Sequence, residues 1–136
     1  MKKSVIVLLF IVYIASIVFI NIFGMKLLAY NKDVYATSIE CINTDMSVNP
    51  ETQLKTKSLH YAEGLTYLIE HRIYPENVSI KTVEYLYDSD LITISDIGVV
   101  SFLKKPTKLR TTVTVTIKTT DKTNVETKIA LTIFKN

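Results

Sequence analysis

The side chains in this sequence that could take part in catalysis are few and widely spaced. Ser58 and His60 stand two positions apart in a strand-like segment, so they could share a face, as a nucleophile and its base must. Neither a Gly-x-Ser-x-Gly turn nor an orienting acid accompanies them. We therefore expect no catalytic residue and no enzymatic activity.

Metal binding would need several converging ligands. Asp88, Asp90 and Asp96 could bring oxygen atoms to Ca²⁺, which takes about 6–8 of them, but aspartate is also common in bends for local hydrogen bonding. His71 could be a metal ligand or a pH-sensitive group, yet His60 is the only other histidine. We expect a half-buried or core His71 with one hydrogen bond, and no metal or cofactor.

Cys41 is the single cysteine, so no disulfide can form within the chain. It alternates with Ile39 and Thr37 in a strand-like segment, and free cysteines are often buried. We expect Cys41 to be a small buried apolar residue, with an intermolecular disulfide or a reactive thiol as the alternative. A domain of about 100 residues must then be held together by its apolar core, which is feasible at that size.

The first element of the chain is an apolar N-terminal run. Lys2 and Lys3 precede Val5 to Phe23, nineteen residues without a charge. As a helix rising ~1.5 Å per residue, this run would extend roughly 28 Å, close to the ~30 Å hydrocarbon core of a bilayer. We predict a transmembrane helix that contacts the lipid bilayer through Val5 to Phe23, within an N-terminal part that covers residues 1–29.

A cleaved signal peptide is the alternative, because it shares the basic start. Its apolar stretch is usually only ~7–15 residues long, and the candidate cleavage triplets at 27–29 and 34–36 are imperfect, so we favour an uncleaved anchor. Basic residues near a span stay on the cytoplasmic side. Lys2 and Lys3 therefore predict a single-pass protein of the cell membrane with a cytoplasmic N-terminus and an extracytoplasmic domain over residues 30–136.

The charge of the exported part argues against nucleic-acid binding. Two of the sixteen Lys and Arg residues precede the apolar run, which leaves fourteen basic residues against thirteen acidic ones. The densest basic cluster, Lys104, Lys105, Lys108 and Arg110, is typical of a solvated loop. We expect no nucleic-acid partner.

From Tyr35 onward, apolar and polar side chains alternate with a period of two, which is typical of strands with one buried face. The segments are 35–42, 65–74, 82–87, 91–95, 99–103, 111–119 and 126–134. The last two flank a Thr-Asp-Lys-Thr-Asn turn and predict a β-hairpin. Between 43 and 58 we expect a loop with one irregular edge strand near 54–59. The pattern predicts an all-β sandwich or barrel.

Residues 64–77, GLTYLIEHRIYPEN, contain the most informative local pattern. Gly64 is placed at the turn into a strand, where a positive φ is accessible to glycine. The residues expected to share one strand face are Leu65, Tyr67, Ile69, His71 and Ile73. Pro75 cannot donate a ladder hydrogen bond, so the strand should end before it.

This stretch resembles the bacterial immunoglobulin-like domain of group 2, a module of invasin- and intimin-type surface proteins. The family pattern is a glycine, a Thr-Tyr pair, an aliphatic residue and an alternation ending in Pro-Glu-Asn. The matching residues are Gly64, Thr66-Tyr67, Ile69, Ile73 and Pro75-Glu76-Asn77, followed by Val83-Glu84-Tyr85, Asp88-Ser89-Asp90, Ile92-Thr93-Ile94, Gly98-Val99-Val100 and the closing Thr-Val-Thr-Val-Thr hairpin. The resemblance covers roughly residues 35–134.

The sequence also departs from the family pattern. Tyr85 stands where tryptophan is usual, His71 stands where a small residue is usual, and residues 104–107 replace the glycine common before the closing hairpin. The resemblance implies an immunoglobulin-like Greek-key sandwich that serves as a spacer or binding module, with no shared catalytic site.

The expected function is a membrane-anchored extracytoplasmic interaction module, with a structural or binding role and a protein partner at the cell envelope. Two alternatives stay open at this point. The chain could be a regulatory or sensory subunit of a membrane complex, or a secreted soluble binding module.

Overall fold

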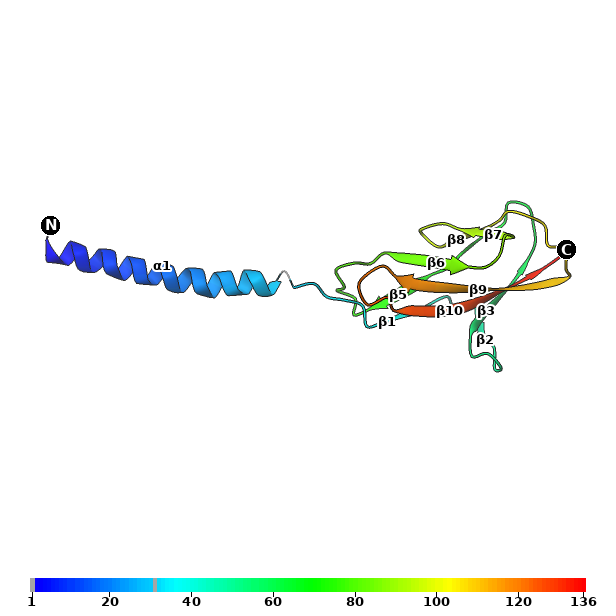
Figure 1. Cartoon of the computed structure of the whole chain (residues 1–136), viewed down its shortest axis with the longest axis horizontal. Coiled ribbons are helices and arrows are strands. Elements are labelled where there is room, and N and C mark those ends of the chain that lie inside the picture. The colour runs from blue at the N-terminus through cyan, green and yellow to red at the C-terminus, as the bar shows by residue number, and fades with distance from the viewer. Residues whose placement is uncertain (1, 31) are drawn as a thin grey trace. The chain divides into compact units, whose positions relative to one another are not determined.

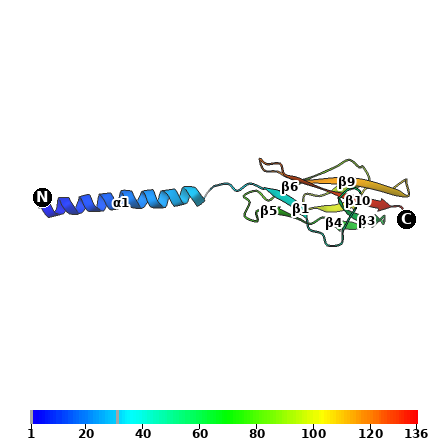
Figure 2. The same ribbon diagram turned by 90° about the horizontal axis from the view of Figure 1, so that it is seen from below.

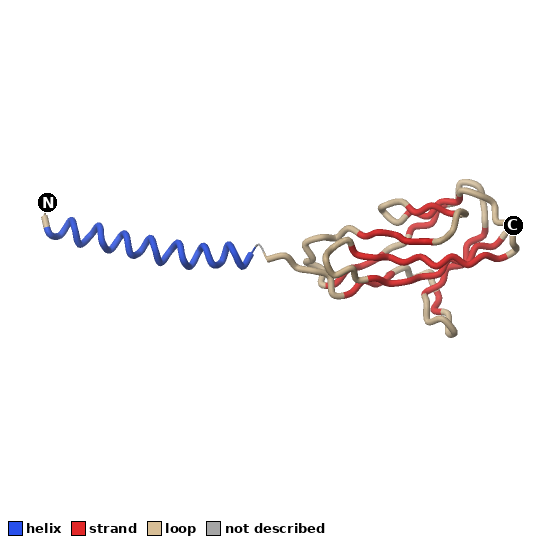
Figure 3. Tube along the Cα trace, viewed as in Figure 1, coloured by secondary structure: helices blue, strands red, loops and turns tan. Residues whose placement is uncertain are grey.

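The computed structural model describes residues 2–30 and 32–136, except for the side chains of residues 25–30. The chain divides into two compact units, Met1–Asp33 and Val34–Asn136. The first unit contains one helix, and the described strands all belong to the second (Figure 1, Figure 3). The predicted cleavage triplet at 27–29 lies outside the described side chains, and the predicted boundary at residue 30 stays a prediction.

Helix α1 (Lys3–Tyr30) includes the predicted apolar run. Its segment Lys3–Gly24 has a mean hydropathy of 3.0, and its large apolar side chains are exposed. Ser16 and Asn21 donate side-chain hydrogen bonds to the carbonyls of Val12 and Ile17, so both polar groups are satisfied within the helix. The helix is long and apolar enough to cross a membrane, a property that signal sequences share.

The described part of the second unit is β-rich, and every segment predicted to be a strand contains one. The strands are β1 (Ser38–Cys41), β2 (Ser47–Val48), β3 (Lys55–His60), β4 (Thr66–Leu68), β5 (His71–Tyr74), β6 (Val83–Tyr87), β7 (Ile92–Ile94), β8 (Val99–Phe102), β9 (Arg110–Thr119) and β10 (Glu126–Phe134). The predicted hairpin of β9 and β10 is confirmed, with Leu131 opposite Val113.

Three sheets form from these strands. The largest has the order β2-β3-β10-β9-β6, in which β10 pairs antiparallel with β9 and parallel with β3. The two smaller sheets are β1-β5 and β4-β8-β7. In the turned view, β9 runs along one side of this unit and β4 and β5 along the other (Figure 2).

The two smaller sheets are linked by one bent strand, because β4 and β5 are consecutive. The amide of Ile69 donates to the carbonyl of Gly98, and the amide of Ile42 donates to the carbonyl of Glu70. The predicted strand 65–74 therefore has the right position and the predicted end before Pro75, but it is interrupted at Ile69 and Glu70. Its alternation persists through the break.

A buried asparagine holds the break in place. Asn43 is 8% exposed, and its Nδ2 donates to the carbonyl of Leu68 over 2.8 Å. Its Oδ1 accepts from the amide of Glu70 at 2.7 Å and from the thiol of Cys41 at 3.2 Å. The Leu68 carbonyl and the Glu70 amide at the bend are thus both satisfied by one amide side chain.

The core lies between the faces predicted to be apolar. Its buried members are Ala36, Ile39, Cys41, Leu59, Ile69, Ile73, Val78, Ile92, Val100, Val113, Val115, Ile117, Ile129, Leu131 and Ile133. Strands β9 and β10 supply six of these residues, because alternate side chains of each strand point into the core. In β10 the intervening Ala130 and Thr132 are buried as well.

The segment 43–58 contains more regular structure than the predicted loop. A strand does occupy the region near 54–59, but β3 is not a simple edge strand: β10 pairs along its whole length and β2 pairs with its first two residues. The β2-β3 hairpin projects from the side of this unit (Figure 1). Parallel pairing with β10 uses backbone groups, so the polar side chains of β3 gave little indication of it.

The turn between β9 and β10 is tied to the start of the domain. Asp121 is 4% exposed, and its carboxylate accepts hydrogen bonds from the side chain and amide of Thr123, the hydroxyl of Thr119 and the amide of Ala36. These donors, the Thr123 hydroxyl first, lower the pKa of Asp121 to about 2. Aspartate was expected to stabilise this turn locally, and the bond to Ala36 adds a long-range contact.

Candidate functional site

Cys41 is buried, as predicted. It is 2% exposed, and its thiol donates to Oδ1 of Asn43 and lies 3.7 Å from Sδ of Met46. Burial raises the pKa of the thiol, which disfavours the thiolate needed for nucleophilic chemistry. The interpretation as a reactive thiol is therefore not supported by its surroundings.

Ser58 and His60 share the exposed face of β3, on either side of buried Leu59, as their spacing predicted. His60, however, stacks on Phe134 with ring centroids 5.3 Å apart, and its Nδ1 lies 3.3 Å from Oδ1 of Asn136. The side-chain contacts described for His60 are thus with Phe134, the last residue of β10, and with Asn136 beyond it, and not with Ser58. This pair has no arrangement suited to nucleophilic catalysis.

The three aspartates considered for calcium are not gathered into a ligand set. Asp90 forms an exposed ion pair of 2.7 Å with Lys104, and this hydrogen bond lowers the pKa of the carboxyl. Within the described residues, no group of three or more His, Cys, Asp or Glu side chains could hold a metal ion. Lys104 belongs to the basic loop that was interpreted as solvated, and its side chain is 63% exposed.

His71 is half-buried, and its ring has one hydrogen bond among the described residues, as expected. Its Nδ1 lies 3.1 Å from Oη of Tyr85, and the two rings meet edge to face with centroids 6.2 Å apart. Because His71 is on β5 and Tyr85 on β6, this bond joins the five-stranded sheet to the opposite sheet. Burial lowers the pKa of His71, so the neutral imidazole is favoured.

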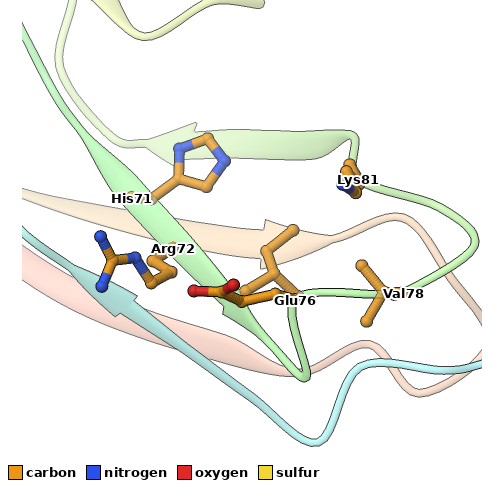
Figure 4. A pocket seen from close by; sticks show the side chains of 6 residues that line it. His71, Arg72, Glu76, Val78 and Lys81 are labelled. Carbon is orange, nitrogen blue, oxygen red and sulfur yellow. The ribbon is translucent and has the colours of Figure 1, made fainter.

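His71 also borders an open pocket of about 360 Å³. The lining residues are His71, Arg72, Ile73, Glu76, Val78 and Lys81. In Figure 4, His71 and Arg72 project from opposite sides of β5, and Lys81 comes from the loop that follows it. Arg72, Lys81 and Glu76 give the pocket charges of both signs, while His71 is engaged with Tyr85. Such a lining suits a polar contact surface and contains no nucleophile paired with a base.

Sequence reasoning missed the glycine on which the His71–Tyr85 contact depends. Gly98 has φ of 87°, and a Cβ added there would lie 2.6 Å from the Ile69 carbonyl oxygen and 2.6 Å from Oη of Tyr85. Tyr85 therefore reaches His71 only because residue 98 has no side chain. Gly98 is the first residue of the Gly-Val-Val motif, but the sequence motif does not indicate that Tyr85 packs against it.

The His71 environment predicts a pH dependence of stability. A folded-state pKa below that of the unfolded chain gives stability that is complete above about pH 6.5 and declines as the pH falls through the folded-state value. Denaturant unfolding of the full-length protein in nanodiscs at pH 7.5 and pH 5 should show this loss. A His71→Gln variant should lose less unfolding free energy than wild type between pH 7.5 and pH 5. A His60→Gln control should lose as much as wild type over the same interval. An equal loss in His71→Gln and wild type would contradict the assignment of this pH dependence to His71.

Comparison with known proteins provides no assignment by similarity. No protein-family model matches the sequence, and no curated protein is significantly similar to it. The resemblance to the bacterial immunoglobulin-like domain of group 2 therefore depends on the sequence motifs and their order alone.

Proposed function

We propose that this chain is a single-pass membrane protein whose helix anchors an immunoglobulin-like interaction module outside the cytoplasm, with a non-enzymatic binding role at the cell envelope. The observation that carries the proposal is α1. Its 22-residue apolar segment is 0% buried, while the β-rich unit has a core of its own. Apolar surface of that extent is stable in lipid and costly in water.

The strand order supports an immunoglobulin-like Greek key. Such sandwiches place strands A to G in sheets A-B-E-D and C-F-G. With β1 as A, the bent strand β4-β5 as B, β6 as C, β7 as D, β8 as E, β9 as F and β10 as G, the observed pairings follow that order. The additional strand β3 pairs beside G. Tyr85 lies on the C strand, where immunoglobulin domains commonly have a buried tryptophan.

The lining of the candidate pocket favours binding over catalysis. The described side chains that could act as nucleophile, base or metal ligand are buried, paired or dispersed. A stable sandwich with polar loops is a common scaffold for recognition, although this step is by analogy with other domains of the fold. Partner crosslinking in native membranes should recover envelope proteins.

The anchor is tested by topology. In spheroplasts that express the full-length protein with a C-terminal tag, external protease should remove the tag and the β-rich unit and leave a small membrane-embedded fragment, because Lys2 and Lys3 retain the N-terminus inside. A cytoplasmic protein serves as the control for intact membranes. A protected tag would reverse the orientation, and a soluble mature protein that begins near Tyr30 or Thr37 would favour the secreted module instead.

A further inference from the structure

Strand β6 is the longest edge strand among the described strands. The strands at the other sheet edges are shorter: β1 and β5 have four residues each, β4 and β7 three each, and β2 two. The edge of β7 is also occupied, because the amide of Ile94 donates to Oη of Tyr87 over 3.2 Å. Proteins usually protect edges with Pro, Lys, bulges or very short strands. β6, with the sequence VEYLY, has none of these.

The backbone of β6 offers a regular set of hydrogen-bonding groups to a further strand. The amide of Thr120 donates to the carbonyl of Thr82, so the even-numbered residues of β6 direct their backbone groups toward β9. Val83, Tyr85 and Tyr87 consequently direct theirs to the open side. Among the described residues, no loop backbone pairs with these groups.

The side chains of β6 and the charges at its ends match an antiparallel copy of the same strand. Glu84 and Leu86 occupy its outer face, where Leu86 is 42% exposed. Lys81 precedes the strand and Asp88 follows it. Asp90 is already paired with Lys104, so Asp88 is the acidic group available at that end. A strand with a basic start and an acidic end is complementary to itself when reversed.

We propose that β6 pairs antiparallel with β6 of a second copy of this chain, centred on Tyr85, and joins the two five-stranded sheets into one. In this register Val83 lies opposite Tyr87 of the second copy, and both residues present open backbone groups. Glu84 lies opposite Leu86. A register centred on Glu84 would place two glutamates face to face, which is unfavourable.

The pairing also brings Lys81 of each copy to the strand end that carries Asp88 of the other. These are exposed charges, so they select the register more than they add affinity. The inference depends on the sheet alone and stands whether or not α1 crosses a membrane. Its failure is therefore distinguishable from failure of the proposed anchor.

Disulfide crosslinking tests the register. Opposite residues of a non-hydrogen-bonded antiparallel pair have Cα atoms about 4.5 Å apart, within the range that a disulfide requires. Differently tagged full-length chains carrying Glu84→Cys and Leu86→Cys, expressed together, should form a mixed disulfide-linked dimer under mild oxidation. Glu84→Cys expressed alone should remain largely uncrosslinked, and Cys41 is buried and should not contribute.

Charge substitution tests the same contact without a crosslink. Leu86→Glu places two glutamates opposite each other at both ends of the strand pair and should weaken self-association of the full-length protein in nanodiscs or detergent roughly tenfold. Leu86→Lys removes the same apolar side chain but faces Glu84, so it should retain or strengthen the dimer. Leu68, 47% exposed on β4, supplies the matched controls Leu68→Glu and Leu68→Lys, which should leave association unchanged.

The contrary results are equally defined. Crosslinking of Glu84→Cys to itself would indicate another register and overturn the proposal. Equal loss of association in Leu86→Glu and Leu86→Lys would indicate a general apolar contact instead of strand pairing. A monomeric wild-type protein, or a crosslink to a different protein, would show that the edge is not a contact between two copies.

Discussion

Gly98→Ala is expected to destabilise the β-rich unit by ~2–5 kcal/mol, the sum of backbone strain and overpacking. The φ of 87° is strained for any residue with a Cβ. The added methyl group would also lie 2.6 Å from the Ile69 carbonyl oxygen. This oxygen belongs to the backbone of the bend between β4 and β5, so moving it would disturb the bend. Tyr85 would have to withdraw from His71, which removes the hydrogen bond between the sheets.

Gly64→Ala is the matched control, because Gly64 has a similar φ of 76° but nothing within 4 Å of an added Cβ. Gly64→Ala should lower the free energy of unfolding only by the cost of backbone strain, ~1–2 kcal/mol. Thermal unfolding of the full-length protein in nanodiscs, followed by β-sheet circular dichroism, separates the two, since each kcal/mol corresponds to roughly 4–8 °C for a domain of this size. Equal melting temperatures for both variants would refute the close contact at Gly98.

Side-chain periodicity was sufficient to predict most of the strands. The β9-β10 hairpin alternates without interruption, and Asp121 and Asn124 at its turn suit the local geometry, so segment type and partner could both be inferred. Periodicity reports which face of a strand is buried, but it does not report which backbone groups are paired. The parallel pairing of β3 with β10 and the break at Ile69 therefore had no sequence signal.

The burial of individual residues in the candidate site could be predicted from the sequence, but the contacts between them could not. His71 and Cys41 lie on apolar phases of their strands, and their burial follows from that position alone. The partners Tyr85, Asn43 and Gly98 come from other strands and loops. Their contacts depend on how the sheets pack, and no fixed spacing between residues in the sequence predicts such packing.

Asn43→Ala is the second substitution with a large expected effect. Asn43 lies in the segment predicted to be a polar loop, yet its side chain pairs two backbone groups at the bend of the β4-β5 strand. Removing it leaves the Glu70 amide and the Leu68 carbonyl without these partners, at ~1–3 kcal/mol for each buried group. The total destabilisation should be ~2–6 kcal/mol, a substantial fraction of the stability of an ordinary domain.

The loss should also be local, and this distinguishes it from a general packing defect. Hydrogen exchange at the Glu70 amide should accelerate more than exchange in the β9-β10 hairpin, since the bend opens before the long strands separate. Asn43→Asp keeps an acceptor for the Glu70 amide but loses the donor to Leu68, so its stability should lie between those of wild type and Asn43→Ala. Asn77→Ala, at an exposed position, should leave both stability and exchange unchanged. If Asn43→Ala is as stable as Asn77→Ala, then solvent replaces the amide at the bend, and the link between the two smaller sheets does not depend on Asn43.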